Sequence, residues 1–121
     1  RAARWGRVLA ITSATVRQPT PKLMLSTMAR AGATGFLKSL ALEVAVDGVT
    51  VNSIQPGSHD TERLRSLYGG DLSRAAADVP MGHVGDADDF GRVAAFLCSE
   101  SARFITGAAI PVDGGRWDGL Q

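Results

Sequence analysis

Three short runs of residues along the chain have the pattern of β-strands. Residues 7–12 are almost continuously apolar, which is typical of a strand covered on both faces in a parallel sheet. Residues 49–54 form a second strand-like run that Pro56 and Gly57 bring to an end. Residues 109–112 form a third. Pro111 within that run cannot donate to a ladder, so we expect this strand at a sheet edge.

The segments between these runs have helical spacing. Residues 22–46 contain no proline and are apolar over most of the helix circumference, which predicts a helix buried on more than one side. Residues 60–68 and 71–78 predict two short helices, and Asp86 begins a stronger one with acidic residues in its first turn. The order strand, helix, strand, helices, strand predicts an α/β fold with parallel strands and right-handed crossovers.

Composition narrows the classes of function. A chain of 121 residues with a net charge of +1 has no basic cluster that would indicate a nucleic-acid partner. One cysteine, Cys98, excludes a disulfide framework, fits a reducing cytoplasm and is expected to be a core thiol. The two histidines, His59 and His83, are too isolated to suggest a metal site. No apolar run is long enough to span a membrane, and no secretory signal begins the chain.

Candidate chemistry gathers where the predicted strands end. Ligands of open parallel sheets bind outside the carboxyl ends of the strands, which here bring Ser13 and residues 58–61 to one rim. Ser26 and Arg30 are four residues apart on one helix face, and both reach the same rim if that helix packs beside the first strand.

Four tracts in this order resemble one protein family. They are residues 6–13 (GRVLAITS), residues 38–54 (KSLALEVAVDGVTVNSI), residues 55–61 (QPGSHDT), and the pair FITG and VDGG at residues 104–107 and 112–115. The chain is similar over almost its whole length to short-chain dehydrogenases/reductases, and most similar to their 3-oxoacyl-carrier-protein reductase-like members.

The resemblance implies a fold and a cofactor. Residues 1–121 would be one partial domain, the C-terminal half of a Rossmann-type doubly wound parallel sheet with three strands and flanking helices. The glycine-rich loop that receives the cofactor pyrophosphate belongs to the family's N-terminal half, and no Gly-x-Gly pair occurs in this chain. We therefore expect NAD or NADP to bind only to a complete protein.

The catalytic set departs from the family pattern. Ser13 stands at the position of the family's serine, which polarises the substrate oxygen. Ser26 and Arg30 stand where the family has its tyrosine and lysine. A serine hydroxyl is far less acidic than a phenol, whose pKa is about 10, so the proton relay is interrupted and its donor is unknown. Arg30 can still hold ribose hydroxyls or a phosphate. The plainer alternatives are turn chemistry for Ser13, a small helix residue for Ser26 and a solvated charge for Arg30.

The loop after the second strand resembles the one that frames the nicotinamide. Pro56, Gly57, His59 and Thr61 are the cofactor-binding candidates in it. Thr61 would contact the carboxamide, and it is also suited to be the N-cap of the following helix. His59 either faces the substrate cleft or is merely exposed.

The resemblance implies NAD(P)-dependent hydride transfer between an alcohol and a carbonyl on a small molecule. The alternative is a non-catalytic binding or assembly module that has kept the fold and lost the relay. A serine hydrolase is disfavoured because no Gly-x-Ser-x-Gly elbow occurs. In the family, the helix predicted over residues 22–46 pairs with its copy in a second subunit, which implies a homodimer or homotetramer, with residues 1–5 as the tail of a neighbouring helix.

Overall fold

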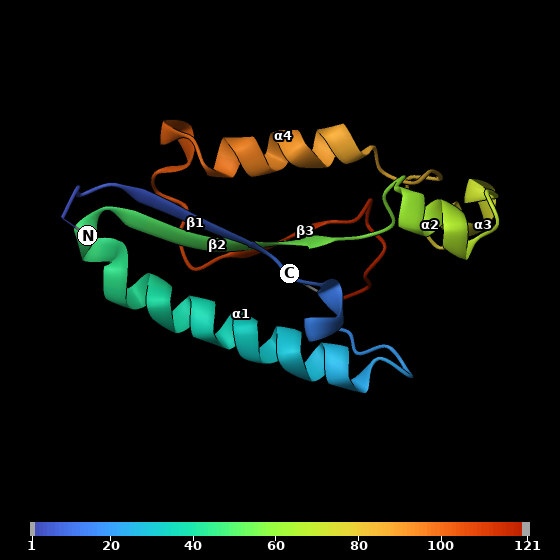
Figure 1. Cartoon of the computed structure of the whole chain (residues 1–121), viewed down its shortest axis with the longest axis horizontal. Coiled ribbons are helices and arrows are strands. Elements are labelled where there is room, and N and C mark those ends of the chain that lie inside the picture. Colours follow the sequence, from blue (N-terminus) through green and yellow to red (C-terminus); the bar gives the residue numbers. More distant parts are fainter. Residues whose placement is uncertain (1, 120–121) are drawn as a thin grey trace.

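The computed structural model describes residues 2–119 as a three-stranded parallel sheet with helices on both faces (Figure 1). The strands are β1 (Gly6–Ile11), β2 (Val49–Pro56) and β3 (Ala109–Val112), in the order β1-β2-β3. Ile54 of β2 pairs with Ile11 on one side and with Ile110 on the other. The expected fold class is confirmed, and Pro111 lies in a strand that has one partner among the described residues.

The central strand supplies side chains to two cores. Helix α1 (Met24–Val44), with the short turn η2 (Ala45–Asp47), covers one face of the sheet. Helix α4 (Ala87–Leu97), with η3 (Glu100–Ala102), covers the other. Val51 packs against Ala41 of α1, whereas Ile54 packs against Leu97 of α4. Residues 50–55 of β2 are buried and include the polar Thr50, Asn52, Ser53 and Gln55. The expected cover on both faces does not hold for β1 in the single chain, because Val8 and Ile11 are exposed.

The remaining short elements lie toward the carboxyl ends of the strands. They are η1 (Ala14–Val16), α2 (Glu62–Leu67) and α3 (Leu72–Ala76). In Figure 1, α2 and α3 lie beyond the end of β2, and η1 lies beside the start of α1. The loops and short helices η1, α2 and α3 therefore surround the carboxyl ends of the strands (Figure 1).

Helix boundaries differ from those that the sequence predicts. The long helix begins at Met24 rather than residue 22, because Lys22 has a left-handed backbone with φ of 68°. It ends at Val44, and a 3₁₀ turn then leads to Gly48, whose φ is 72°. The two short helices are also shorter than expected, at Glu62–Leu67 and Leu72–Ala76.

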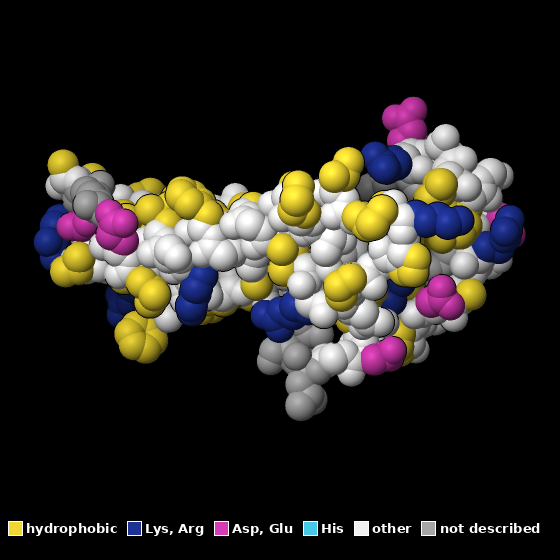
Figure 2. Space-filling model, turned by 90° about the horizontal axis from the view of Figure 1, so that it is seen from below, with side chains coloured by type: hydrophobic (Ala, Val, Ile, Leu, Met, Phe, Trp, Pro, Cys, Tyr) yellow, Lys and Arg dark blue, Asp and Glu magenta, His cyan; other side chains and the backbone are white. Residues whose placement is uncertain are grey.

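The outer face of α1 remains apolar and uncovered in the single chain. Leu25, Phe36 and Leu42 are 78%, 67% and 74% exposed. Figure 2 looks onto the α1 side of the molecule, where hydrophobic side chains recur along the whole length of the surface. Burial of α1 on a second side stays a prediction that requires a partner.

A buried asparagine fastens the segment before β3 to the central strand. The Asn52 amide donates to the Ile105 carbonyl at 2.8 Å and accepts from the Ala108 backbone N–H at 3.1 Å. The Thr106 hydroxyl accepts from the Val51 backbone N–H at 3.0 Å. Gly107 then turns with a φ of 69°. These contacts explain why the ITG sequence directly precedes β3.

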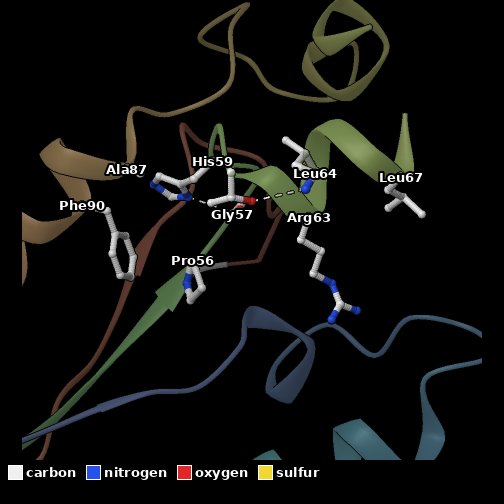
Figure 3. A pocket seen from close by; sticks show the side chains of 9 residues that line it. Pro56, Gly57, His59, Arg63, Leu64, Leu67, Ala87 and Phe90 are labelled. Carbon is white, nitrogen blue, oxygen red and sulfur yellow. Dashed lines mark hydrogen bonds between the residues drawn. The ribbon is translucent and has the colours of Figure 1, made fainter. Parts of the chain in front are cut away.

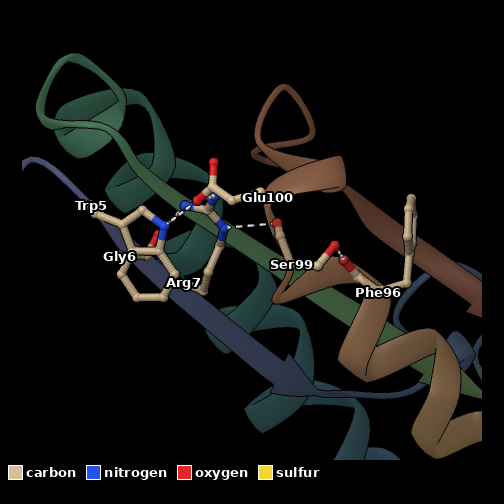
Figure 4. Close-up of polar contacts among 6 residues, drawn as sticks. All are labelled: Trp5, Gly6, Arg7, Phe96, Ser99 and Glu100. Atoms are coloured by element: carbon tan, nitrogen blue, oxygen red, sulfur yellow. Dashed lines mark hydrogen bonds and ion pairs between the residues drawn. The ribbon is translucent and has the colours of Figure 1, made fainter.

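The amino ends of the strands are closed by a cluster around Arg7 (Figure 4). Its side chain is 5% exposed, lies 4.9 Å from the Trp5 ring and forms an ion pair of 3.1 Å with Glu100. Trp5 donates to the same carboxylate, and the Arg7 guanidinium donates to the Ser99 carbonyl at 3.3 Å. The cluster fixes the start of β1 to the segment after α4.

The end of α4 and the amino end of the chain have local features that the sequence does not predict. Cys98 is exposed, so the expected core thiol is wrong; the neighbouring Leu97 takes the buried position and Cys98 caps the helix. Residues 2–4 form a turn, and Arg1 lies outside the described residues. None of the helices described in residues 2–119 has the length and apolar character needed to cross a membrane.

Candidate functional site

Ser13 lies directly after β1 and caps the turn η1. Its hydroxyl oxygen accepts from the Thr15 backbone N–H at 3.2 Å and from the Thr15 hydroxyl at 3.0 Å. Turn chemistry is thus confirmed for Ser13. Because both acceptor positions of its oxygen are used, the Ser13 hydroxyl proton is left to donate to another group. A role toward substrate stays a prediction.

Arg30 connects α1 to the end of β1. Its Nε donates to the Ser26 hydroxyl oxygen at 3.2 Å, and its Nη1 donates to the Thr12 carbonyl oxygen at 2.9 Å. The expected i, i+4 pair therefore forms and reaches the rim of the sheet. Arg30 thus contacts the chain one residue before Ser13 and also binds Ser26, so it links the region of all three candidates for the catalytic set.

The loop after β2 approaches the turn after β3 very closely. The Gly57 N–H donates to the Val112 carbonyl at 2.9 Å, and a Cβ atom on Gly57 would lie 2.6 Å from Asp113 Cα. The backbone there excludes any larger residue, which explains the glycine without a left-handed conformation. The Asp113 side chain accepts from the Gly115 N–H at 3.0 Å and so fixes its own turn.

Thr61 is the N-cap of α2, as its sequence position suggests. Its hydroxyl oxygen accepts from the Leu64 backbone N–H at 3.3 Å. This contact fixes the direction in which α2 leaves the loop. A contact of Thr61 with a cofactor carboxamide stays a prediction.

His59 is half-buried and well anchored, so the interpretation of a merely exposed loop histidine is wrong. Its ring meets Phe90 edge-on with centroids 4.9 Å apart, and its Nδ1 lies 3.2 Å from the Gly57 carbonyl oxygen. Beneath the ring, Gly85 forms an isolated parallel bridge with His59. A Cβ on Gly85 would lie 2.6 Å from the imidazole, so the ring occupies the space of that missing side chain.

A cavity of about 300 Å³ opens beside this loop, between α2 and the start of α4 (Figure 3). We call it the rim cavity. It is lined by Pro56, Gly57, His59, Thr61, Arg63, Leu64, Leu67, Ala87 and Phe90. All four loop residues singled out from the sequence line it, whereas Ser13, Ser26 and Arg30 do not. Sequence reasoning missed Arg63 and the wall formed by Phe90.

One carboxylate near the cavity is already paired. Arg65 donates to the two oxygens of Asp60, from Nε and Nη2, at 2.6 Å each. Hydrogen bonding to this guanidinium lowers the pKa of Asp60 below its ordinary value, and the same bond raises the pKa of Arg65. No group of His, Cys, Asp and Glu side chains in residues 2–119 is arranged to hold a metal ion.

The shape of the site fits a nicotinamide group in part. The rim cavity is mostly apolar, as suits a planar ring, and the Thr61 hydroxyl and loop backbone supply polar atoms at its edge. Arg30 keeps Nη2 without a partner among the described residues and so has a donor to offer.

Comparison with known proteins gives the same family throughout. A family model described as enoyl-(acyl carrier protein) reductase matches residues 1–116. The chain is 36% identical over 115 residues to the 3-oxoacyl-[acyl-carrier-protein] reductase FabG of Pseudomonas aeruginosa, covering 95% of this chain and 47% of that protein. It is 37% identical over 114 residues to the acetoacetyl-CoA reductase of Shinella zoogloeoides, covering 93% and 47%.

Solved structures agree with the sequence relatives. YwfH, an NADPH-dependent reductase involved in bacilysin biosynthesis, superposes with a TM-score of 0.91 at 28% identity, covering 98% of this chain and 50% of that one. An NADPH-bound short chain oxidoreductase of Pseudomonas aeruginosa PAO1, described as containing an atypical catalytic center, gives 0.84 at 28% identity, covering 94% and 47%. The chain spans about half the length of the relatives it matches.

Proposed function

The chain belongs to the short-chain dehydrogenase/reductase family, and we propose that it is the substrate-side half of an oxidoreductase that interconverts an alcohol and a carbonyl on a small molecule with NAD or NADP. The observation that carries the proposal is the Arg30 bridge. It holds a cation and the Ser26 hydroxyl against the end of β1, where the family has its catalytic groups.

Each residue of the site has a task in this proposal. The Ser13 hydroxyl donates to the substrate oxygen, because its own oxygen already accepts twice from Thr15. Arg30 donates to the ribose hydroxyls of the cofactor. Residues 56–61 frame the nicotinamide and exclude water from one side of it. When bound, the cofactor supplies or takes up the hydride.

Proton transfer is the weak step of this site. Ser26 cannot replace a phenol whose pKa of about 10 is brought lower by a neighbouring cation. Arg30 stays protonated at any physiological pH and cannot shuttle a proton. We therefore expect slow turnover of simple 3-oxo esters, with water or a group outside residues 2–119 as the proton donor. A solved relative described as NADPH-bound, with an atypical catalytic center, supports the view that an altered set is compatible with cofactor binding.

The test restores the relay in the full-length protein. Ser26→Tyr with Arg30→Lys should raise the rate of NADPH oxidation by about 100-fold or more with a 3-oxo ester, as general acid–base catalysis typically does. The matched control is Ser26→Phe with Arg30→Lys, which adds the ring without the hydroxyl and should give no gain. Equal rates for the two double variants, with NADPH binding intact, would count against the relay argument.

The alternative is a binding or assembly module without catalysis. It is favoured by the Arg30 contacts themselves, since a guanidinium tied to Ser26 and to a backbone carbonyl also serves as a purely structural brace. Calorimetric titration with NADH and NADPH separates the two functions. A full-length protein that binds neither is a module of this second kind.

A second copy of the chain is the proposed partner for the outer face of α1, in a homodimer or homotetramer. The exposed Leu25, Phe36 and Leu42 support it, as does the open space around Gly32 and Gly35, where no atom lies within 4 Å of an added Cβ. The exposed thiol of Cys98 fits a reducing, cytoplasmic compartment. A stable monomer in sedimentation at micromolar concentration would refute the oligomer.

A further inference from the structure

One permanently charged side chain lines the rim cavity, and it belongs to Arg63 at the start of α2. The walls beside it are apolar and come from Leu64, Leu67, Ala87 and Phe90. A guanidinium keeps its charge at every physiological pH, so the cavity is an apolar space with a fixed positive charge at one side.

Arg63 has no partner among the described residues, and the local pairing explains why. Asp60 lies three positions earlier, but both of its carboxylate oxygens accept from Arg65 at 2.6 Å. The hydrogen bond from Arg65 also lowers the pKa of Asp60, as expected for a paired carboxylate. Arg116, on the far side of the loop, donates to the Ser58 hydroxyl at 2.5 Å. Arg63 is exposed at the edge of the rim cavity, and its guanidinium has no side-chain or backbone partner among the described residues.

The direction of the side chain is visible in Figure 3. Arg63 extends from α2 toward the segment that carries η1, which begins directly after Ser13. Guanidinium groups bind carboxylates through two parallel hydrogen bonds, which fix position as well as charge.

We propose that Arg63 selects a carbonyl or alcohol substrate that carries a carboxylate, joined to the reacting carbon by a short apolar segment. The apolar wall would take the segment, and Arg63 would take the carboxylate. The inference rests on the proposed oxidoreductase function and adds the class of substrate to it.

The test compares an acid with its ester in the full-length protein. Arg63→Gln should raise the KM for 4-oxopentanoate about tenfold, the effect expected for one hydrogen-bonded ion pair, and leave the KM for methyl 4-oxopentanoate unchanged. Arg63→Lys should lie between Arg63→Gln and the wild type. Arg103→Gln removes the same charge outside the cavity and serves as the matched control, with no effect expected on either substrate.

A binding measurement separates this inference from the proposed function. Calorimetry should show that Arg63→Gln binds hexanoate more weakly than the wild type does, and that both proteins bind hexanamide equally. This result is expected even if neither oxo compound is turned over. That pattern without turnover would support the carboxylate site and contradict the oxidoreductase proposal. Equal KM values for the acid in the wild type and Arg63→Gln would overturn the inference. The inference would also be overturned if Arg63→Gln weakened NADPH binding and raised the KM equally for the acid and the ester. That result would assign Arg63 to a cofactor phosphate.

Discussion

Replacing Gly57 by alanine tests how tightly the loop after β2 is fixed to the turn after β3. The new Cβ would lie 2.6 Å from Asp113 Cα, 2.7 Å from its Cβ and 3.0 Å from its carbonyl oxygen. These are mostly backbone atoms, so no side-chain rotation relieves the overlap, and the two segments must separate. Overpacking typically costs about 1–3 kcal/mol, and loss of the 2.9 Å bond from the Gly57 N–H to Val112 adds about 1 kcal/mol. We expect Gly57→Ala to lower the free energy of unfolding by about 2–4 kcal/mol.

Denaturant unfolding of the full-length protein at fixed protomer concentration measures this change. Gly91→Ala is the matched control, because Gly91 lies within α4 and no atom comes within 4 Å of an added Cβ. Alanine is the better helix former, so this control should gain about 0.5–1 kcal/mol. A Gly57→Ala protein as stable as the wild type would refute the close approach of the two loops. Destabilisation of the Gly91 control would show that the free space around the Cβ position does not decide the effect of alanine at these glycines.

Asn52→Ala should lower the free energy of unfolding by about 2–4 kcal/mol, because it leaves the half-buried Ile105 carbonyl and Ala108 N–H without their partner. Thermal unfolding checks this, and an unchanged midpoint would contradict the bracing role. Arg65→Gln should raise the pKa of Asp60 back toward its ordinary value, measured by carbon NMR titration of its carboxyl group. Because the pKa of Asp60 is lower in the folded state, its ion pair stabilises the fold at a pH above the pKa of the unfolded chain. That contribution is lost as the pH falls through the pKa of the folded state. The same Asp60 pKa in the variant and the wild type would exclude Arg65 as the cause of the lowering.

Much of the fold follows from local signals in the sequence. The bounds of β3 agree with the expected residues 109–112. The helix expected to begin at Asp86 begins at Ala87 with Asp86 as its N-cap, because turn and capping chemistry act within a few residues. The start of α1 was predicted two residues early. A lysine carries no signal that its backbone will be left-handed, as that of Lys22 is. Cys98 follows the last residue of α4, so its exposure depends on where the helix ends, and the apolar character of its neighbours did not reveal that.

The candidate site was predictable where one element supplies it. Ser26 and Arg30 share a helix face at i, i+4, so their contact follows from helix geometry alone. The rim cavity forms between α2 and α4, and its shape depends on the path of the chain between them. The contact of His59 with Phe90 joins residues far apart in sequence, and no local sequence pattern predicts it. For the same reason the sequence does not show that the Arg63 guanidinium lacks a partner, since this depends on the pairing of Asp60 with Arg65.

The position of β1 in the sheet has a practical consequence for anyone who prepares this segment by itself. Among the described residues β1 pairs with β2 alone, so the backbone groups along its other edge have no ladder partner. Val8 and Ile11 are also exposed. An apolar strand with an open edge is a template for hydrogen-bonded pairing with other chains, and natural sheets normally cover or charge such an edge. Residues 1–121 expressed alone should therefore aggregate edge to edge, and a soluble preparation will need a neighbouring strand to close the sheet.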